Sequence, residues 1–256
     1  MRALAALLDR RAALGALRRS LPAGAPPVVA CRSPRGLRHA LETRLVDAIV
    51  LGVRAARRVD LAALRADYPS IPVVGYGALR SDHAGLLLEW QRLEVALVLV
   101  EGVDDPIAGE QVLRHTVSTR RRLALCEAPR LLRLSEPLQV RTWDLLVGAP
   151  GRSPRIANIA REFNLSREHL SRQFGAGGAP NLKRVADLLT VLAALQLLGN
   201  PAYGVSAVAR LLGFATASHL QAVVRRITGL PVKTARGLTE REVLGKFLRV
   251  GARSRG

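Results

Sequence analysis

Two segments in the second half of the chain place hydrogen-bonding side chains at equivalent positions. IANIAREFNLSREHLSRQF begins at residue 156, and VSAVARLLGFATASHLQAVVRR begins at residue 205. The polar residues near the start of each second predicted helix are Glu168, Ser171 and Arg172 in the first segment, and Ser218 and Gln221 in the second. A guanidinium can bond guanine in bidentate fashion, an amide suits adenine, a hydroxyl suits either base type, and a carboxylate accepts from the cytosine amine. These side chains could therefore read base edges of duplex DNA.

The two segments also share the pattern that would position such side chains. Each has a small residue on an apolar-faced helix, then a residue that tolerates a left-handed backbone, a hydroxyl helix cap and an apolar leucine. In chain order the paired positions are Ala160 and Ala209, Asn164 and Gly213, Ser166 and Thr216, and Leu170 and Leu220. This pattern predicts a helix-turn-helix twice, with the second helix of each pair presented to a groove.

Further cations near these helices predict contacts that position DNA without specifying a sequence. The expected phosphate-binding residues are Arg167, Lys183, Arg184, Arg225 and Arg226. An exposed arginine alone is more often a solvated side chain, but inside a duplicated helix-turn-helix we expect base reading from Arg172 and Gln221. Glu168 has the alternative role of repelling phosphate. His169 and His219 have no second ligand at a usable spacing, so a metal site there is not expected.

The net charge of +19 is distributed unevenly along the chain. Residues 1–120 carry 17 Lys+Arg against 12 Asp+Glu, whereas residues 121–256 carry 22 against 8. A strongly basic half joined to a less basic half favours one domain that binds a polyanion and one domain with another role. Codon bias toward arginine would raise the total but would not explain the asymmetry.

The first half alternates short apolar runs with helical patterns. The expected strands are 27–31, 47–52, 71–77 and 95–102, and the expected helices are 36–45, 61–69, 82–93 and 105–125. Strands that alternate with helices predict a parallel sheet covered on both faces, here a flavodoxin-like α/β sandwich. Residues 1–21 are expected to form one amphipathic helix that ends at Pro22 and precedes this domain.

Residues 138–238 resemble the DNA-binding domain of the AraC family, two helix-turn-helix modules joined by one helix. The match comprises IAREFNLSREHLSRQF, NLKRVADLLTVLAALQLLGN and VSAVARLLGFATASHLQAVVRRITGLPVKTAR. The resemblance implies sequence-specific transcription regulation, with base-reading side chains at Glu168, Ser171 and Arg172. The joining helix departs from the family because Asp187, Leu188 and Leu189 stand where arginines are usual. Its apolar surface predicts burial against the front domain, against another chain, or as core to both modules.

Residues 26–122 resemble the receiver domain of response regulators, with departures at each chemical position. Gly52 stands where the phospho-accepting aspartate is expected, Gly77 replaces the hydroxyl residue, and Glu101 replaces the lysine. We expect Cys31-Arg32 to follow the first strand in place of the acidic pair that binds Mg²⁺. Without a carboxylate nucleophile, oxygen ligands and a cation, phosphorylation is not expected. The remaining roles are dimerisation, ligand binding as signal input, or stabilising the neighbouring domain.

The sequence therefore predicts an α/β receiver-like domain followed by an all-α double helix-turn-helix domain. We expect the first domain over 1–125, a linker over 126–135 and the second domain over 136–256. No catalytic set, cofactor motif or metal cluster is found in the sequence, so an enzyme is not expected. Two cysteines and no apolar run of about 18 residues favour a cytoplasmic protein without a membrane span.

The expected partners are double-stranded DNA first, then RNA polymerase and a second copy of the chain. One rival function is a protein-interaction adaptor whose helix-turn-helix folds no longer bind DNA. The second rival is an enzyme that uses the α/β sandwich, which the missing polar residues at the strand ends disfavour.

Overall fold

The computed structural model describes residues 2–149 and 154–253, and of residues 251–253 it describes the backbone only. The chain divides into two compact units. The first comprises Met1–Arg120 with Asn200–Ala202, and the second comprises Arg121–Gly199 with Tyr203–Gly256.

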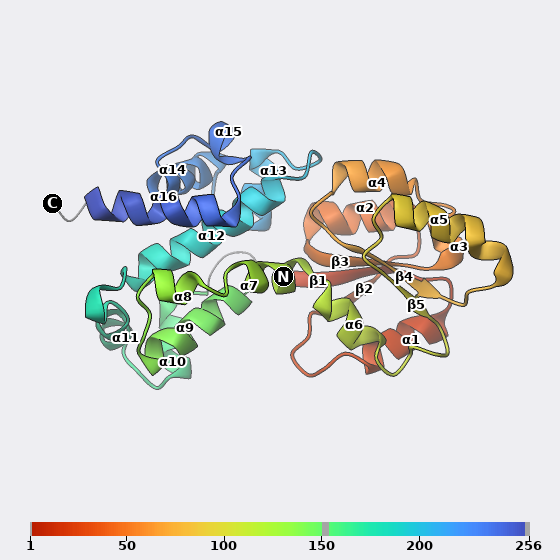
Figure 1. The fold of residues 1–256 in the computed structure, drawn as a ribbon, viewed down its shortest axis with the longest axis horizontal. Helices are drawn as coiled ribbons and strands as arrows, with labels where there is room; N and C mark the ends of the chain where they lie inside the picture. The colour runs from red at the N-terminus through yellow and green to blue at the C-terminus, as the bar shows by residue number, and fades with distance from the viewer. Residues whose placement is uncertain (1, 150–153, 254–256) are drawn as a thin grey trace. The chain divides into compact units, whose positions relative to one another are not determined.

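A parallel sheet forms the centre of the first unit (Figure 1). Its strands are β1 (Arg2–Leu7), β2 (Val28–Ala30), β3 (Leu45–Leu51), β4 (Val73–Gly77) and β5 (Leu97–Val100). Their order is β2-β1-β3-β4-β5, and each neighbouring pair is parallel. This is the flavodoxin-like order, in which the chain reverses its winding direction between β1 and β3. The fold class expected from the sequence is confirmed.

The expectation of a leading helix over residues 1–21 is wrong. Residues 2–7 form the strand β1, and only Arg11–Arg19 form a helix, α1. Alanine and leucine favour helix locally. However, Ala3 to Leu7 are all buried in a strand that lies between β2 and β3 in a sheet covered on both faces, and such a strand is a continuous apolar run. Tertiary burial therefore overrides the local propensity.

Helices cover both faces of this sheet. They are α1, α2 (Pro34–Thr43), α3 (Val53–Ala56), α4 (Leu61–Asp67), a 3₁₀ turn η1 (Ser81–His83), α5 (Ala84–Arg92) and α6 (Ala108–Arg114). In Figure 1, α1 and α6 lie on one face, and α2, α4 and α5 lie on the other.

The single helix expected over 105–125 is interrupted, because α6 ends at Arg114 and α7 (Val117–Ala124) begins three residues later. The Thr116 hydroxyl donates to the Leu113 carbonyl at 2.8 Å and accepts from the Thr119 amide at 3.3 Å. A threonine that bonds both flanking turns separates the two helices.

Close packing between sheet and helix depends on one glycine. A Cβ on Gly75 would lie 2.0 Å from Cζ3 of the Trp90 ring. Trp90 in α5 is 1 % exposed and packs directly onto the β4 backbone. The absence of a side chain at residue 75 therefore permits the largest aromatic of this unit to lie against the sheet.

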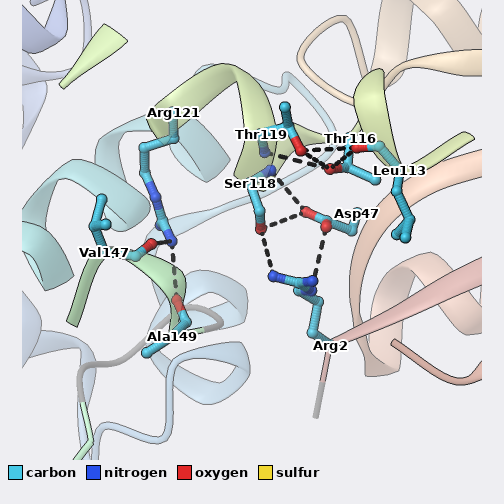
Figure 2. Close-up of polar contacts among 9 residues, drawn as sticks. All are labelled: Arg2, Asp47, Leu113, Thr116, Ser118, Thr119, Arg121, Val147 and Ala149. Atoms are coloured by element: carbon cyan, nitrogen blue, oxygen red, sulfur yellow. Dashed lines mark hydrogen bonds and ion pairs between the residues drawn. The ribbon is translucent and has the colours of Figure 1, made fainter. Parts of the chain in front are cut away.

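A buried carboxylate, that of Asp47, lies at the end of the sheet where β1 and β3 begin (Figure 2). Asp47 Oδ1 accepts from the Ser118 amide at 3.0 Å and from its hydroxyl at 2.9 Å, and Oδ2 pairs with Arg2 Nε at 3.2 Å. Arg2 also donates to the Ser118 hydroxyl at 3.0 Å. A charge that is 4 % exposed is tolerated here because Ser118 donates twice to Oδ1 and Arg2 places an opposite charge beside Oδ2.

The described part of the second unit is helical. Besides the end of α7, it contains α8 (Ala128–Leu131), α9 (Pro137–Gly148), α10 (Ile156–Glu162), α11 (Arg167–Phe174), a 3₁₀ turn η2 (Ala176–Gly178), α12 (Leu182–Leu198), α13 (Val205–Leu211), α14 (Ala217–Thr228), α15 (Val232–Ala235) and α16 (Glu240–Arg253). The expected linker over 126–135 includes α8, and the domain limits stay a prediction.

Candidate nucleic-acid interface

The two helix pairs α10–α11 and α13–α14 are joined by turns of the same geometry. Asn164 has φ 55° and Gly213 has φ 71°. One residue later, the Leu165 amide donates to the Ala160 carbonyl at 2.9 Å, and the Phe214 amide donates to the Ala209 carbonyl at 2.8 Å. This bond ends the first helix of each pair through one left-handed residue. The duplicated helix-turn-helix is confirmed at the level of the backbone.

The second helix of each pair begins at the expected hydroxyl cap. Ser166 accepts from the His169 amide at 3.1 Å, and Thr216 accepts from the His219 amide at 3.1 Å. Leu170 and Leu220 are fully buried one turn later. The cap and the buried leucine fix which face of each helix points outward.

The outward face of α11 carries charge of both signs. Glu168 and Arg172 are exposed and Ser171 is half-buried. Arg167 pairs with Glu168 at 3.1 Å, and Arg172 Nη2 lies 3.4 Å from His169 Nδ1. A bond from its own backbone amide, together with Arg167, lowers the pKa of Glu168. Glu168 is therefore ionised at neutral pH, and Arg172 is the exposed cation of this face that has no carboxylate partner among the described residues.

The outward face of α14 is sparser. Ser218 and Gln221 are exposed, as are Ala222 and the cations Arg225 and Arg226. His219 packs edge-on against Phe214, with ring centroids 5.2 Å apart. This contact gives His219 a packing role beside the turn. The structure thus brings all five expected base-reading residues to the outward surfaces of α11 and α14.

These helices lie within a segment that matches a known family. Residues 159–237 match the model of a helix-turn-helix domain. This segment is an AraC-type helix-turn-helix domain. The AraC-type domain supports a DNA-binding transcription regulator, as the sequence predicted.

Three solved structures of regulators are similar to this chain at low sequence identity. The RcsB response regulator of Salmonella typhimurium has 15% identity and a TM-score of 0.36, over 74% of this chain and 99% of that one. FixJ from B. japonicum has 14% identity and a TM-score of 0.39, over 93% and 98%. The transcriptional regulator CdpR from Pseudomonas aeruginosa has 22% identity and a TM-score of 0.37, over 73% and 62%. These TM-scores are low, and the strand order β2-β1-β3-β4-β5 and the duplicated turn define the folds of the two units.

No curated protein matches the chain. Within residues 2–149 and 154–253, no helix has the length and apolar character needed to cross a bilayer.

The helix α12 forms the core of the AraC-type domain. Most of its 17 residues are buried, and it packs against α9, α11, α13, α14 and α16. Of the three alternatives for its apolar surface, these contacts support a core shared by both modules. Seventeen residues span about 25 Å at the usual rise of an α-helix.

Asp187 on α12 binds two of the expected phosphate contacts. Its Oδ2 lies 3.1 Å from Lys183 Nζ and 2.7 Å from Arg226 Nη2. Arg184 stacks over the ring of Phe247 at 5.0 Å. Arg225 is exposed on α14. Sequence reasoning noted Asp187 only as a departure from the family and missed this ion pair, because Asp187 and Arg226 are 39 residues apart.

Gln139 attaches α9 to the first module. Its Oε1 accepts from the amides of Ser135 and Glu136, both at 3.0 Å. Its Nε2 donates to the Phe174 carbonyl at 2.9 Å and the Ala176 carbonyl at 3.1 Å. This buried amide satisfies the start of α9 and the end of α11 at once.

A polar site lies at the carboxyl ends of the strands in the receiver-like unit. Gly52, Gly77 and Glu101 lie there, after β3, at the end of β4 and after β5, as expected. The expectation for Cys31-Arg32 is wrong, because these residues follow the edge strand β2. Residues Leu8 to Arg10 follow the first strand instead, so an acidic residue, Asp9, is present after β1.

The Asp9 carboxylate occupies the space beside Gly52. It accepts from the Arg54 amide at 2.9 Å and the Ala55 amide at 2.8 Å. A Cβ on Gly52 would lie 2.7 Å from Asp9 Oδ2 and 2.9 Å from the Asp9 backbone nitrogen. Glu101 pairs with Arg10 at 2.6 Å. The loop after β1 thus fills the position from which a phospho-accepting side chain would extend.

Proposed function

We propose that this protein is a sequence-specific transcription regulator whose helices α11 and α14 read adjacent segments of the DNA major groove. The observation that carries the proposal is the repetition of one turn, with φ 55° at Asn164 and φ 71° at Gly213, before two capped helices with polar outward faces. In this arrangement the first helix of each pair crosses the backbone and the second enters the groove. In this proposal the protein is cytoplasmic, and its partners are double-stranded DNA and RNA polymerase.

The two helices differ in the chemistry that they offer to bases. On α11, Arg172 and Ser171 supply donors suited to guanine and to either base type, and ionised Glu168 supplies an acceptor. On α14 the polar residues near the start are Ser218, His219 and Gln221, beside alanine methyl groups, and His219 is packed against Phe214. We assign most of the sequence discrimination to α11. The exposed Arg225 and Arg226 give α14 a larger share of backbone contacts.

Selection of bound fragments from genomic DNA with the full chain tests this function. The expected result is an enriched motif with two half-sites about one DNA turn apart, bound more tightly than random duplex. No enrichment, together with no binding to any duplex at low salt, would contradict the proposal.

A protein-interaction adaptor is the second candidate. The observation that favours it is the pairing of Lys183 and Arg226 with Asp187, which reduces the cations available to phosphate. The two candidates differ in salt dependence. A DNA-binding protein loses affinity for random duplex steeply with added salt, by a log–log slope of about −0.9 per phosphate contact. An adaptor shows no duplex binding at all.

The receiver-like unit serves, in this proposal, for dimerisation or signal input without phosphorylation. Gly52 has no carboxylate, Asp9 fills the adjacent space, and Glu101 replaces a cation with an anion. Incubation with acetyl phosphate and Mg²⁺, followed by intact-mass measurement, should leave the mass unchanged. A gain of one phosphoryl group that Asp9→Asn removes would refute this part of the proposal.

A further inference from the structure

A cavity of about 300 Å³ opens in the first unit where the parallel strands end. Its lining is mostly charged and includes Asp9, Arg10, Arg54, Arg57, Arg80 and Glu101. Residues 9–10 follow β1 and residues 53–57 follow β3, so the cavity lies where the winding of the sheet reverses. Open α/β sheets bind their ligands in the crevice at this point.

The carboxylates that line the cavity each have a partner. Asp9 accepts from two backbone amides, as described above. Glu101, whose side chain is 7% exposed, pairs with Arg10. Asp82 Oδ1 lies 3.7 Å from His83 Nε2. Arg10 therefore neutralises Glu101 and two amides stabilise Asp9, whereas the contact of Asp82 with His83 is an ion pair only when His83 is protonated.

Three arginines of the lining differ from the carboxylates in this respect. In the described part of the chain, Arg54, Arg57 and Arg80 form no ion pair, and all three are exposed. They come from two segments, the helix α3 with its end and the loop after β4. The Arg80 amide donates to His83 Nδ1 at 3.1 Å, which holds the start of this loop. The cavity thus has three cations whose donors are available to a ligand.

We propose that this cavity binds a compact dianion, inorganic phosphate or a small phosphate monoester, through Arg54, Arg57 and Arg80. Guanidinium groups match the oxygens of a phosphoryl group in bidentate fashion, and the four arginines of the lining exceed its three carboxylates by one positive charge. The bound group stays intact, since Gly52 supplies no nucleophile and no bond changes. A volume of about 300 Å³ exceeds that of phosphate and leaves room for a small organic substituent.

A phosphate site in the receiver-like unit is a property separate from the proposed DNA binding, because it gives this unit a ligand of defined charge. DNA binding resides on the AraC-type domain and is measured separately. Loss of one property therefore does not imply loss of the other.

The test is isothermal titration of the full chain with inorganic phosphate, and separately with phenyl phosphate, at constant ionic strength set by chloride. Arg57→Gln and Arg80→Gln are the test variants. Arg58→Gln is the matched control, because Arg58 is the exposed neighbour of Arg57 and does not line the cavity. A second control, Arg225→Gln with Arg226→Gln, removes cations of the AraC-type domain that could bind phosphate in place of DNA.

We expect both test variants to weaken phosphate binding by about tenfold or more, the usual effect of losing a charge-assisted hydrogen bond. Both controls should bind as the unaltered chain does. Tighter binding of phenyl phosphate than of phosphate would identify a monoester as the ligand, and equal binding would identify phosphate itself. Any one of three results overturns the proposal. The first is that the unaltered chain does not bind phosphate at millimolar concentration. The others are that Arg57→Gln and Arg58→Gln lose phosphate affinity equally, or that only the Arg225→Gln, Arg226→Gln double variant loses it.

Discussion

The carboxylate of Asp187 in α12 lies 2.7 Å from the guanidinium of Arg226 in α14. Asp187 is also 3.1 Å from Lys183 on its own helix. The joining helix therefore holds two cations that we expect near the DNA backbone. If these cations contact DNA, Asp187 competes with phosphate for both of them.

Asp187→Asn should tighten binding to random duplex and steepen its dependence on salt. Each released cation that contacts a phosphate adds about 0.9 to the magnitude of the log–log slope. The free energy of unfolding should fall by at most about 1 kcal/mol, because the pair is partly exposed. Fluorescence anisotropy over a salt series measures the slope. Asp144→Asn in α9 is the matched control, because it changes the net charge equally at an exposed aspartate.

Arg172→Ala should weaken binding to the selected site by about 1–3 kcal/mol and leave random duplex nearly unchanged, if Arg172 reads a base. Arg167→Ala is the comparison, because Arg167 is exposed on the same helix but already paired with Glu168. It should weaken both kinds of duplex slightly and equally. Equal losses on selected and random DNA in Arg172→Ala would reassign this residue to phosphate.

Gly213→Val should destabilise the second module by about 1–3 kcal/mol, because a β-branched residue resists a left-handed backbone. Space is not the cause, since a Cβ at Gly213 would meet no atom within 4 Å. Gly237 has the same open surroundings without a positive φ, so Gly237→Val is the control. Urea unfolding followed by circular dichroism compares the two variants. Equal midpoints would disprove the role of the turn.

The hydrogen bond from Tyr76 to Asp105 should make the stability of the first unit depend on pH at both extremes. This bond lowers the pKa of the Asp105 carboxyl, and burial followed by the same bond raises the pKa of Tyr76. The contribution of Asp105 is present above its ordinary pKa of about 3.9 and is lost as the pH falls through the lowered value. The contribution of Tyr76 is present below its ordinary pKa of about 10 and is lost as the pH rises toward the raised value.

Tyr76→Phe removes the contribution of Tyr76 and the largest part of that of Asp105, which keeps its hydrogen bond from the Gly102 amide. It should lower the free energy of unfolding at pH 7 by about 1.5–3 kcal/mol, and it should flatten the losses below pH 4 and above pH 10. Hydrogen exchange of the β4 amides reports this unit separately from the helical one. Unchanged protection at pH 7 would show that the bond contributes nothing to the stability of the sheet.

Local signals predicted the AraC-type domain well. The cap Ser166, the left-handed Asn164 and the buried Leu170 lie within a few residues of one another, so their spacing alone specifies the turn and the outward face. The same holds for the second copy. Residues that read DNA can therefore be proposed from sequence, since exposure follows from helical periodicity.

The first unit was harder to predict because its decisive contacts join distant residues. The run Arg2–Leu7 suits a helix locally, and only its place between two other strands makes it β1. Because residues 2–7 were not expected to form a strand, residues 27–31 counted as the first strand. The position of the acidic pair that follows the first strand was therefore assigned to Cys31 in place of Asp9. The carboxylate of Asp9 bonds an amide 45 residues away, and no periodicity indicates such a contact.

The contact between Gly52 and the loop after β1 also limits how this fold can change. An aspartate at residue 52 alone would collide with Asp9 and with its backbone nitrogen, and a smaller residue at position 9 alone would leave two amides without their acceptor. An aspartate can therefore replace Gly52 only if the loop after β1 changes with it, in sequence or in position.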